Sequence, residues 1–146
     1  MNIAEIPYTG NAAADGVLYH YASIAKEKQI AFKVCCRLNK LSISDTDLCC
    51  LLGNALDNAV TACENVSGKR YITVASEKNQ DMLMLTVDNS FDGNLLKNGE
   101  KILSRKRENE EGIGIRSMKQ ICEKYGGTSR FEAESDCFEA SFMIHI

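Results

Sequence analysis

The sequence predicts an α+β two-layer sandwich, in which a β-sheet is covered by helices on one face. Apolar residues recur at helical spacing in three segments, and other segments have the alternating or continuous apolar pattern of strands. The segments follow one another as helix, strand, helix, two strands, helix and two strands, an order that favours a sheet with helices on one side. With 146 residues, 45% of them hydrophobic, the chain is expected to form one packed domain over residues 1–146, with a lead-in segment at residues 1–10.

The first half of the chain predicts two helices separated by one strand. A helix is expected over residues 11–28, because Asn11 is a typical capping residue and apolar residues recur behind it at helical spacing. Bulky apolar residues then occupy every second position of residues 30–38, as in a half-buried strand. Ser44, followed three positions later by Asp47, predicts the start of a long helix that runs to about residue 64.

The second half predicts two hairpins on either side of a third helix. Strands are expected at residues 71–77 and 82–89, joined by a polar turn. The second of them is almost continuously apolar, so we expect it to be covered on both faces. A helical stripe over residues 115–125 is stopped by Gly126–Gly127, and a turn around Ser135–Asp136 makes the end of the chain a hairpin.

The long helix has two chemically different faces. At about 100° per residue, one face collects Leu48, Leu52, Ala55, Leu56, Ala59 and Cys63. The opposite face carries Asn54, Asn58, Thr61 and Asn65, with Asp57 at its edge. Asparagine is a mediocre residue inside a helix, so Asn54 and Asn58, one turn apart, indicate a use beyond helix formation, although solvation also accounts for them. A carboxamide oxygen is a neutral ligand that Mg²⁺ accepts.

A long charged segment interrupts this compact plan. Residues 90–111 show no periodicity, and a structureless loop of about 20 residues in a compact domain often closes over an active site. Its basic cluster, residues 104–107, precedes Gly112 and Gly114, where a helix is expected to start. Glycines there would let a phosphate approach the free N–H groups of the helix. The same features also fit a solvated loop and a tight turn, and the chain has neither a P-loop motif nor a dinucleotide fingerprint.

Charge, hydropathy and cysteine spacing exclude several other classes. The net charge of −3 argues against a surface that coats nucleic acid or an anionic membrane. No apolar run approaches the roughly 20 residues of a spanning helix, so a cytoplasmic domain is expected. The 7 cysteines have no C-x-x-C spacing and are expected to be reduced core residues, neither metal ligands nor disulfides. His20 and His145 lie far apart and are expected to pack rather than catalyse.

Three motifs, in order along the chain, resemble those of a known superfamily. Residues 52–59 read Leu-Gly-Asn-Ala-Leu-Asp-Asn-Ala, residues 87–91 read Val-Asp-Asn-Ser-Phe, and residues 112–118 read Gly-Ile-Gly-Ile-Arg-Ser-Met. They resemble the N box and the two glycine boxes of the GHKL ATPases, the Bergerat-fold superfamily of gyrase, heat-shock chaperones, histidine kinases and mismatch-repair proteins. The order of elements agrees from about residue 11 to residue 146. The resemblance implies a mixed sheet covered on one face by three helices, with a long ATP lid at residues 90–111.

Within this superfamily the chain is most similar to the catalytic ATP-binding domain of sensor histidine kinases, in particular of the peptide-pheromone (quorum-sensing) subclass. The resemblance implies ATP and Mg²⁺ as ligands, with Asn58 as the Mg²⁺-coordinating residue. Asn54 matches the first N-box position, where hydrolysing relatives carry a glutamate base. Because asparagine cannot take a proton from water near neutral pH, hydrolysis should be slow. Gly112 and Gly114 match the glycines that let phosphate approach.

The lid and the adenine pocket complete the implied site. Ser104 and Arg105 match the lid motif, and Arg105 could stabilise charge on the phosphate oxygens during transfer. Arg105 and Asn54 are the two catalytic candidates. Asn89 stands where the superfamily has an adenine-reading aspartate. Its carboxamide oxygen can still accept a hydrogen bond from the adenine amine, but it lacks the negative charge of the aspartate. Asp88 is one residue off and would point to the opposite face of the strand. Glu110 replaces the first glycine of the second box, so nucleotide binding is expected to be weak.

The implied function is that of an ATP-binding catalytic module of a sensor histidine kinase in two-component signalling. It would transfer the γ-phosphoryl group of ATP to a histidine on a separate dimerisation domain, with a response regulator as the indirect partner. No phosphoacceptor helix pair precedes the domain, so we expect a module excised from a homodimeric membrane receptor, unable to phosphorylate itself alone.

Two alternatives stay open. One is a stand-alone anti-sigma-type serine kinase of the same fold, which genomic context would distinguish. The other is a degenerate docking module that binds no nucleotide, in which the Asn58→Ala substitution would change nothing.

Overall fold

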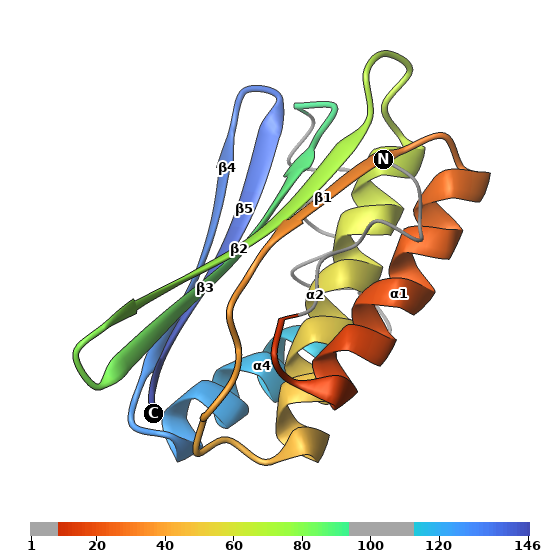
Figure 1. Ribbon diagram of the computed structural model, residues 1–146. Coiled ribbons are helices and arrows are strands. Elements are labelled where there is room, and N and C mark those ends of the chain that lie inside the picture. The colour runs from red at the N-terminus through yellow and green to blue at the C-terminus, as the bar shows by residue number, and fades with distance from the viewer. Residues whose placement is uncertain (1–8, 94–112) are drawn as a thin grey trace.

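The computed structural model describes residues 9–93 and 113–146 of the chain. In this part of the chain, five strands form one sheet and three helices cover one of its faces (Figure 1). The elements are α1 (Ala12–Glu27), β1 (Ala31–Cys35), α2 (Asp45–Glu64), β2 (Tyr71–Asn79), β3 (Met82–Ser90), α4 (Ile113–Lys124), β4 (Thr128–Glu134) and β5 (Cys137–His145). The predicted order of elements and the predicted α+β two-layer architecture are therefore confirmed.

The sheet is mixed, with the strand order β1-β2-β3-β5-β4. β1 pairs with β2 in parallel, and this pairing requires the crossover connection that α2 provides. The other neighbours, β2 with β3, β3 with β5 and β5 with β4, are antiparallel. The crossover places α2 on the sheet, and α2 also contacts α1 on one side and α4 on the other.

The ends of the helices follow the local signals of the sequence. The Asn11 side chain accepts a hydrogen bond from the N–H of Ala14, and the Ser44 side chain accepts one from the N–H of Asp47. α4 ends before Gly126, which has a φ of 73°, and a Cβ atom at Gly127 would overlap the carbonyl oxygen of Met143. The predicted stop at these two glycines is confirmed, because the chain must turn there and run close to β5. None of the described helices has the length and apolar character needed to cross a membrane.

Two expectations about strands are wrong. β3 is not covered on both faces: Leu83, Leu85 and Val87 are buried, whereas Met82 and Met84 on the other face remain partly exposed. The reason is that all the described helices lie on one side of the sheet, so only one set of alternating side chains enters the core. The first strand is also shorter than the predicted 30–38, because β1 pairs with β2 only from Ala31 to Cys35.

All 7 cysteines are free, and only Cys63 and Cys122 are buried. Cys35 and Cys50 are exposed, so the expectation that the cysteines are core residues is wrong for these two. Burial raises the pKa of Cys122 to about 11, so this thiol stays protonated at neutral pH. Within the described residues, no group of His, Cys, Asp and Glu side chains could hold a metal ion.

Polar contacts hold α2 to each neighbouring helix. On one side, the Tyr21 hydroxyl of α1 donates a hydrogen bond of 2.6 Å to Asp57 Oδ1 of α2. On the other side, Asp47 Oδ2 accepts from Lys124 Nζ at 2.9 Å and from the Tyr125 hydroxyl at 2.7 Å. These bonds link the first turn of α2 to the end of α4, and the middle of α2 to α1.

Replacing Tyr21 by phenylalanine tests the α1–α2 link. Tyr21 is 9% exposed and donates to a charged oxygen, so Tyr21→Phe is expected to lower the free energy of unfolding by about 1 to 1.5 kcal/mol, measured by urea denaturation. Tyr19, which lies on the same helix and is 54% exposed, provides the matched control Tyr19→Phe, for which we expect no change. Equal effects of the two substitutions would contradict a stabilising role for this hydrogen bond.

The α2–α4 link is expected to depend on pH. The hydrogen bond from Tyr125 and then that from Lys124 lower the pKa of Asp47 below its ordinary value of 3.8. Its stabilisation is therefore present above that pH and is lost as the pH falls through the lowered, folded-state pKa. We expect Asp47→Asn to reduce the Tm at pH 7, and this deficit to shrink as the pH falls below 3.8.

Asp45→Asn is the matched control for this experiment, because Asp45 also lies in the first turn of α2 and shares any effect of the helix dipole. A deficit of Asp47→Asn that equals that of Asp45→Asn at every pH would rule out a specific contribution from the α4 contact.

Candidate functional site

The candidate site lies where α2 meets the start of α4. Asn54 projects from the middle of α2, and Gly114 lies in the first turn of α4. A Cβ atom at Gly114 would lie 3.3 Å from Asn54 Oδ1, a tighter contact than most real Cβ atoms make. The absence of a side chain at Gly114 therefore lets the Asn54 carboxamide approach the N-terminal turn of a helix, where backbone N–H groups lack helical partners.

The hydrogen bonds of Asn54 orient its carboxamide. Asn54 Nδ2 donates to the carbonyl oxygen of Cys50 at 2.9 Å and lies 3.5 Å from Cys50 Sγ. The same sulfur lies 3.7 Å from the Ser117 hydroxyl of α4. The amide group is thus directed back toward α2, and the acceptor oxygen faces Gly114. Asn54, Cys50, Ser117 and Gly114 form one contact between the two helices.

Asn58 lies one helical turn beyond Asn54 on the same face of α2 and is half-buried. Among residues 9–93 and 113–146, the Asn58 carboxamide has no hydrogen-bond partner. The face that the sequence predicted is therefore present, with two carboxamides one turn apart on α2.

Asn89 lies near the C-terminal end of β3, on the face that packs against the helices, and is only 3% exposed. Its Nδ2 donates to the carbonyl oxygen of Ser90 at 2.8 Å, which leaves an acceptor oxygen at the other end of the carboxamide. Val87 and Asn89 face the helices, whereas Asp88 lies on the opposite face of the strand, as predicted.

Ser90 connects the end of β3 to the neighbouring elements. Its hydroxyl accepts from the N–H of Tyr71 at 3.1 Å and lies 3.3 Å from Cys63 Sγ of α2. Burial raises the pKa of the Cys63 thiol, which therefore stays protonated and neutral beside Ser90. The alternation of β3 breaks here, because Asn89 and Ser90 are both buried.

The structure brings together some of the predicted site residues. Asn54 of α2 lies next to Gly114 of α4, and Asn58 lies on the same face of α2 as Asn54. No hydrogen bond within the described part of the chain joins Asn89 to Asn54 or Asn58. Four predicted features, at Ser104, Arg105, Glu110 and Gly112, lie outside the described residues, as does almost all of the predicted lid.

Sequence reasoning missed the contacts of four side chains that support the site. Cys50 precedes Asn54 by one helical turn, and Ser117 follows Gly114 by three positions, so their helical spacing was a usable signal. The contact between Cys63 and Ser90 had no such signal, because it joins a helix and a strand 27 residues apart.

Solved structures share the fold of this chain at low sequence identity. The catalytic domain of histidine kinase ThkA is 20% identical, with a TM-score of 0.72 and 94% of each chain covered. The mycobacterial sensor histidine kinase MprB is 16% identical, with a TM-score of 0.63, and the match covers 90% of this chain and 95% of that one. Histidine kinase ThkA in complex with response regulator protein TrrA is 20% identical, with a TM-score of 0.69, over 94% of this chain and 40% of that one. These likenesses show that the fold is that of histidine kinase catalytic domains.

No curated protein matches the sequence. The family of GHKL domains, in contrast, matches residues 43–145, a segment that begins just before α2 and includes Asn54, Asn58, Asn89 and Gly114. Because this match spans most of the chain and contains the whole candidate site, the protein belongs to the GHKL domain family.

Proposed function

We propose that the protein is the ATP-binding catalytic module of a sensor histidine kinase, which delivers the γ-phosphoryl group of ATP to a histidine on a separate dimerisation domain. The observation that carries the proposal is the approach of Asn54 on α2 to Gly114 at the start of α4. This contact joins the N box to the second glycine box at the N-terminus of a helix, where a phosphate would be favoured. Membership of the GHKL family and the fold shared with histidine kinase catalytic domains support it.

The donor set fits Mg²⁺-bound nucleotide. Asn58 offers a half-buried carboxamide oxygen, a hard and neutral donor of the type that Mg²⁺ takes alongside water and phosphate oxygens. When bound, Mg²⁺ and ATP would supply the reactive phosphoryl group and offset the charge on its oxygens. The backbone N–H groups at the start of α4, beside Asn54, would hold phosphate, because a helix N-terminus favours anions.

Asn54 accounts for the slow hydrolysis of ATP that we expect at this site. Its Nδ2 is committed to the Cys50 carbonyl, and a carboxamide cannot take a proton from water near neutral pH. Asn54 therefore does not activate water as a general base, and the phosphoryl group remains available for transfer to an imidazole nucleophile. Arg105 and Ser104 of the lid motif would complete the site, with Arg105 stabilising charge on the phosphate during transfer.

Asn89 would read the adenine ring. Because its Nδ2 donates to the Ser90 carbonyl, its Oδ1 is the acceptor available to an exocyclic amine. A neutral carboxamide makes a weaker hydrogen bond than the carboxylate it replaces, so we expect weak affinity, in the micromolar to millimolar range.

The partners follow from the same assignment. The phosphoacceptor histidine would lie on a dimerisation domain of a homodimeric parent kinase, anchored in the membrane with this module on the cytoplasmic side. A response regulator would take the phosphoryl group onward, and the complex of ThkA with TrrA is an example in a protein of the same fold. The N box and Ser-Arg lid of this chain favour the peptide-pheromone subclass.

Titration calorimetry with a non-hydrolysable ATP analogue tests the proposal directly. We expect binding that requires Mg²⁺ and that Asn58→Ala weakens by at least about tenfold, a typical loss when metal coordination is disturbed. Asn79→Ala, the same chemical change at an exposed position near the far end of β2, is the matched control and should bind normally. Absence of heat at any accessible concentration would instead identify a docking module that binds no nucleotide. Equal binding of the analogue by Asn58→Ala would contradict the role of Asn58 as a Mg²⁺ ligand.

The close approach at Gly114 allows a second test. Gly114→Ala would place a methyl group 3.3 Å from Asn54 Oδ1, so we expect the affinity for the nucleotide analogue to fall, by about tenfold if roughly 1.4 kcal/mol is lost. Its free energy of unfolding should not fall, because alanine is favoured over glycine in helices by about 1 kcal/mol.

Gly53→Ala is the control for this substitution. Gly53 lies next to Asn54 in α2, and a Cβ atom there would meet nothing within 4 Å. Gly53→Ala should therefore stabilise the fold without changing the affinity. A loss of affinity in both variants, or in neither, would argue against a phosphate site at the start of α4.

A further inference from the structure

The sheet has a second face, which none of the described helices covers (Figure 1). We call it the open face; it consists of the side chains that alternate with the core positions of the five strands. Three methionines lie on it: Met82 and Met84 of β3, and Met143 of β5, which is 37% exposed. Met84 and Met143 are direct cross-strand neighbours. The apolar run in β3 therefore supplies an exposed apolar surface as well as core residues.

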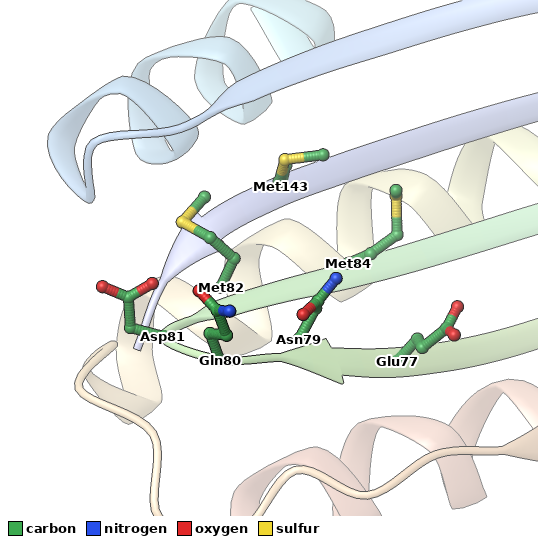
Figure 2. A pocket seen from close by; sticks show the side chains of 7 residues that line it. All are labelled: Glu77, Asn79, Gln80, Asp81, Met82, Met84 and Met143. Carbon is green, nitrogen blue, oxygen red and sulfur yellow. The ribbon is translucent and has the colours of Figure 1, made fainter.

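A shallow cavity of about 380 Å³ lies over these methionines. Figure 2 shows the three methionine side chains rising from β3 and β5, with the carboxylates of Asp81 and Glu77 toward opposite ends of the cavity. Methionine is flexible and polarisable, so a methionine surface adapts to varied apolar side chains. The cavity thus combines an adaptable apolar floor with acidic groups at its rim.

A row of carboxylates crosses the same face beside the methionines. Asp88 of β3 lies directly opposite Glu139 of β5, which lies directly opposite Glu132 of β4. Asp88 Oδ1 is buried and has no hydrogen-bond partner. Burial and then the Asp88 carboxylate raise the pKa of Glu139. Like charges in register repel each other. Arg130 forms an ion pair with Glu132 at 3.8 Å, and its charge also acts to lower the pKa of Glu139, but burial and Asp88 outweigh it.

The open face is acidic as a whole. Its strand positions carry the carboxylates of Glu77, Asp88, Glu132, Glu134 and Glu139. The lysine and arginine residues at its strand positions are Lys33 and Arg130, and His145 lies on the same face. An anionic membrane or a nucleic acid would be repelled by this surface, whereas a basic protein segment would be attracted to it.

We propose that the open face is a docking surface for a basic amphipathic helix of a partner protein. Apolar side chains of the helix would enter the cavity over Met82, Met84 and Met143, and its lysines or arginines would pair with the row Asp88–Glu139–Glu132. A cation there neutralises carboxylates that now repel each other, so the contact gains from relief of that repulsion as well as from attraction. The surface lies on the other side of the sheet from Asn54 and Gly114, and the proposal does not depend on nucleotide binding.

Methyl NMR of methionine-labelled protein provides the test. The probe is an 18-residue amidated peptide of leucine and lysine at helical spacing, and its control is the same peptide with every lysine replaced by glutamate. We expect the leucine–lysine peptide to shift the methyl signals of Met82, Met84 and Met143. The signal of Met118, a fully buried core residue of α4, should not move. The glutamate peptide should shift none of them.

Matched charge variants distinguish docking on the open face from attraction of the basic peptide to the overall negative charge of the protein. The variant Asp88→Asn/Glu132→Gln/Glu139→Gln is expected to bind the lysine peptide about tenfold more weakly, because each exposed ion pair contributes modestly. The variant Glu27→Gln/Glu64→Gln/Glu123→Gln removes the same charge from exposed helix positions and should bind normally. Equal weakening in both variants, absence of shifts on the open face, or equal binding of the glutamate peptide would each overturn the proposal.

Discussion

The burial of α2 between the sheet and its two neighbouring helices is the constraint on which the candidate site depends. Leu48, Leu52 and Leu56 form a stripe that is fully buried, and this stripe determines the rotation of the helix about its axis. With the rotation set, Asn54 is directed toward α4 and Asp57 toward Tyr21 of α1. A change that rotated α2 would expose leucine and break both polar contacts, so the hydrophobic core is what holds the functional face in place.

Backbone carbonyls then orient the polar groups that remain. Asn54 donates to the carbonyl of Cys50, and Asn89 donates to the carbonyl of Ser90, so the acceptor oxygens of both carboxamides are left for other partners. Together with Asn58, these groups are three neutral carboxamides, so none of them carries a charge. The charge of a bound triphosphate would therefore have to be balanced by Mg²⁺, by the helix N-terminus or by cations of the lid motif such as Arg105.

The two faces of β3 divide the molecule into two chemically different surfaces. Val87 and Asn89 face the helices, whereas Met84 and Asp88 face the opposite direction. Adjacent residues of one strand thus contribute to the candidate nucleotide site and to the acidic open face. This separation follows from strand geometry alone, since successive side chains point to opposite sides of a sheet.

Local signals in the sequence were enough to predict the order of elements, the caps at Asn11 and Ser44, the two faces of α2 and the family of the protein. These are local properties, because capping, helical spacing and motif residues lie within a few positions of one another. Three features became visible only in the packed fold: β3 is covered on one face, Cys35 and Cys50 are exposed, and Cys63 contacts Ser90. Which face of a strand is covered, and which distant side chains meet, depends on how whole elements pack, and residues far apart in sequence carry no local signal of that packing.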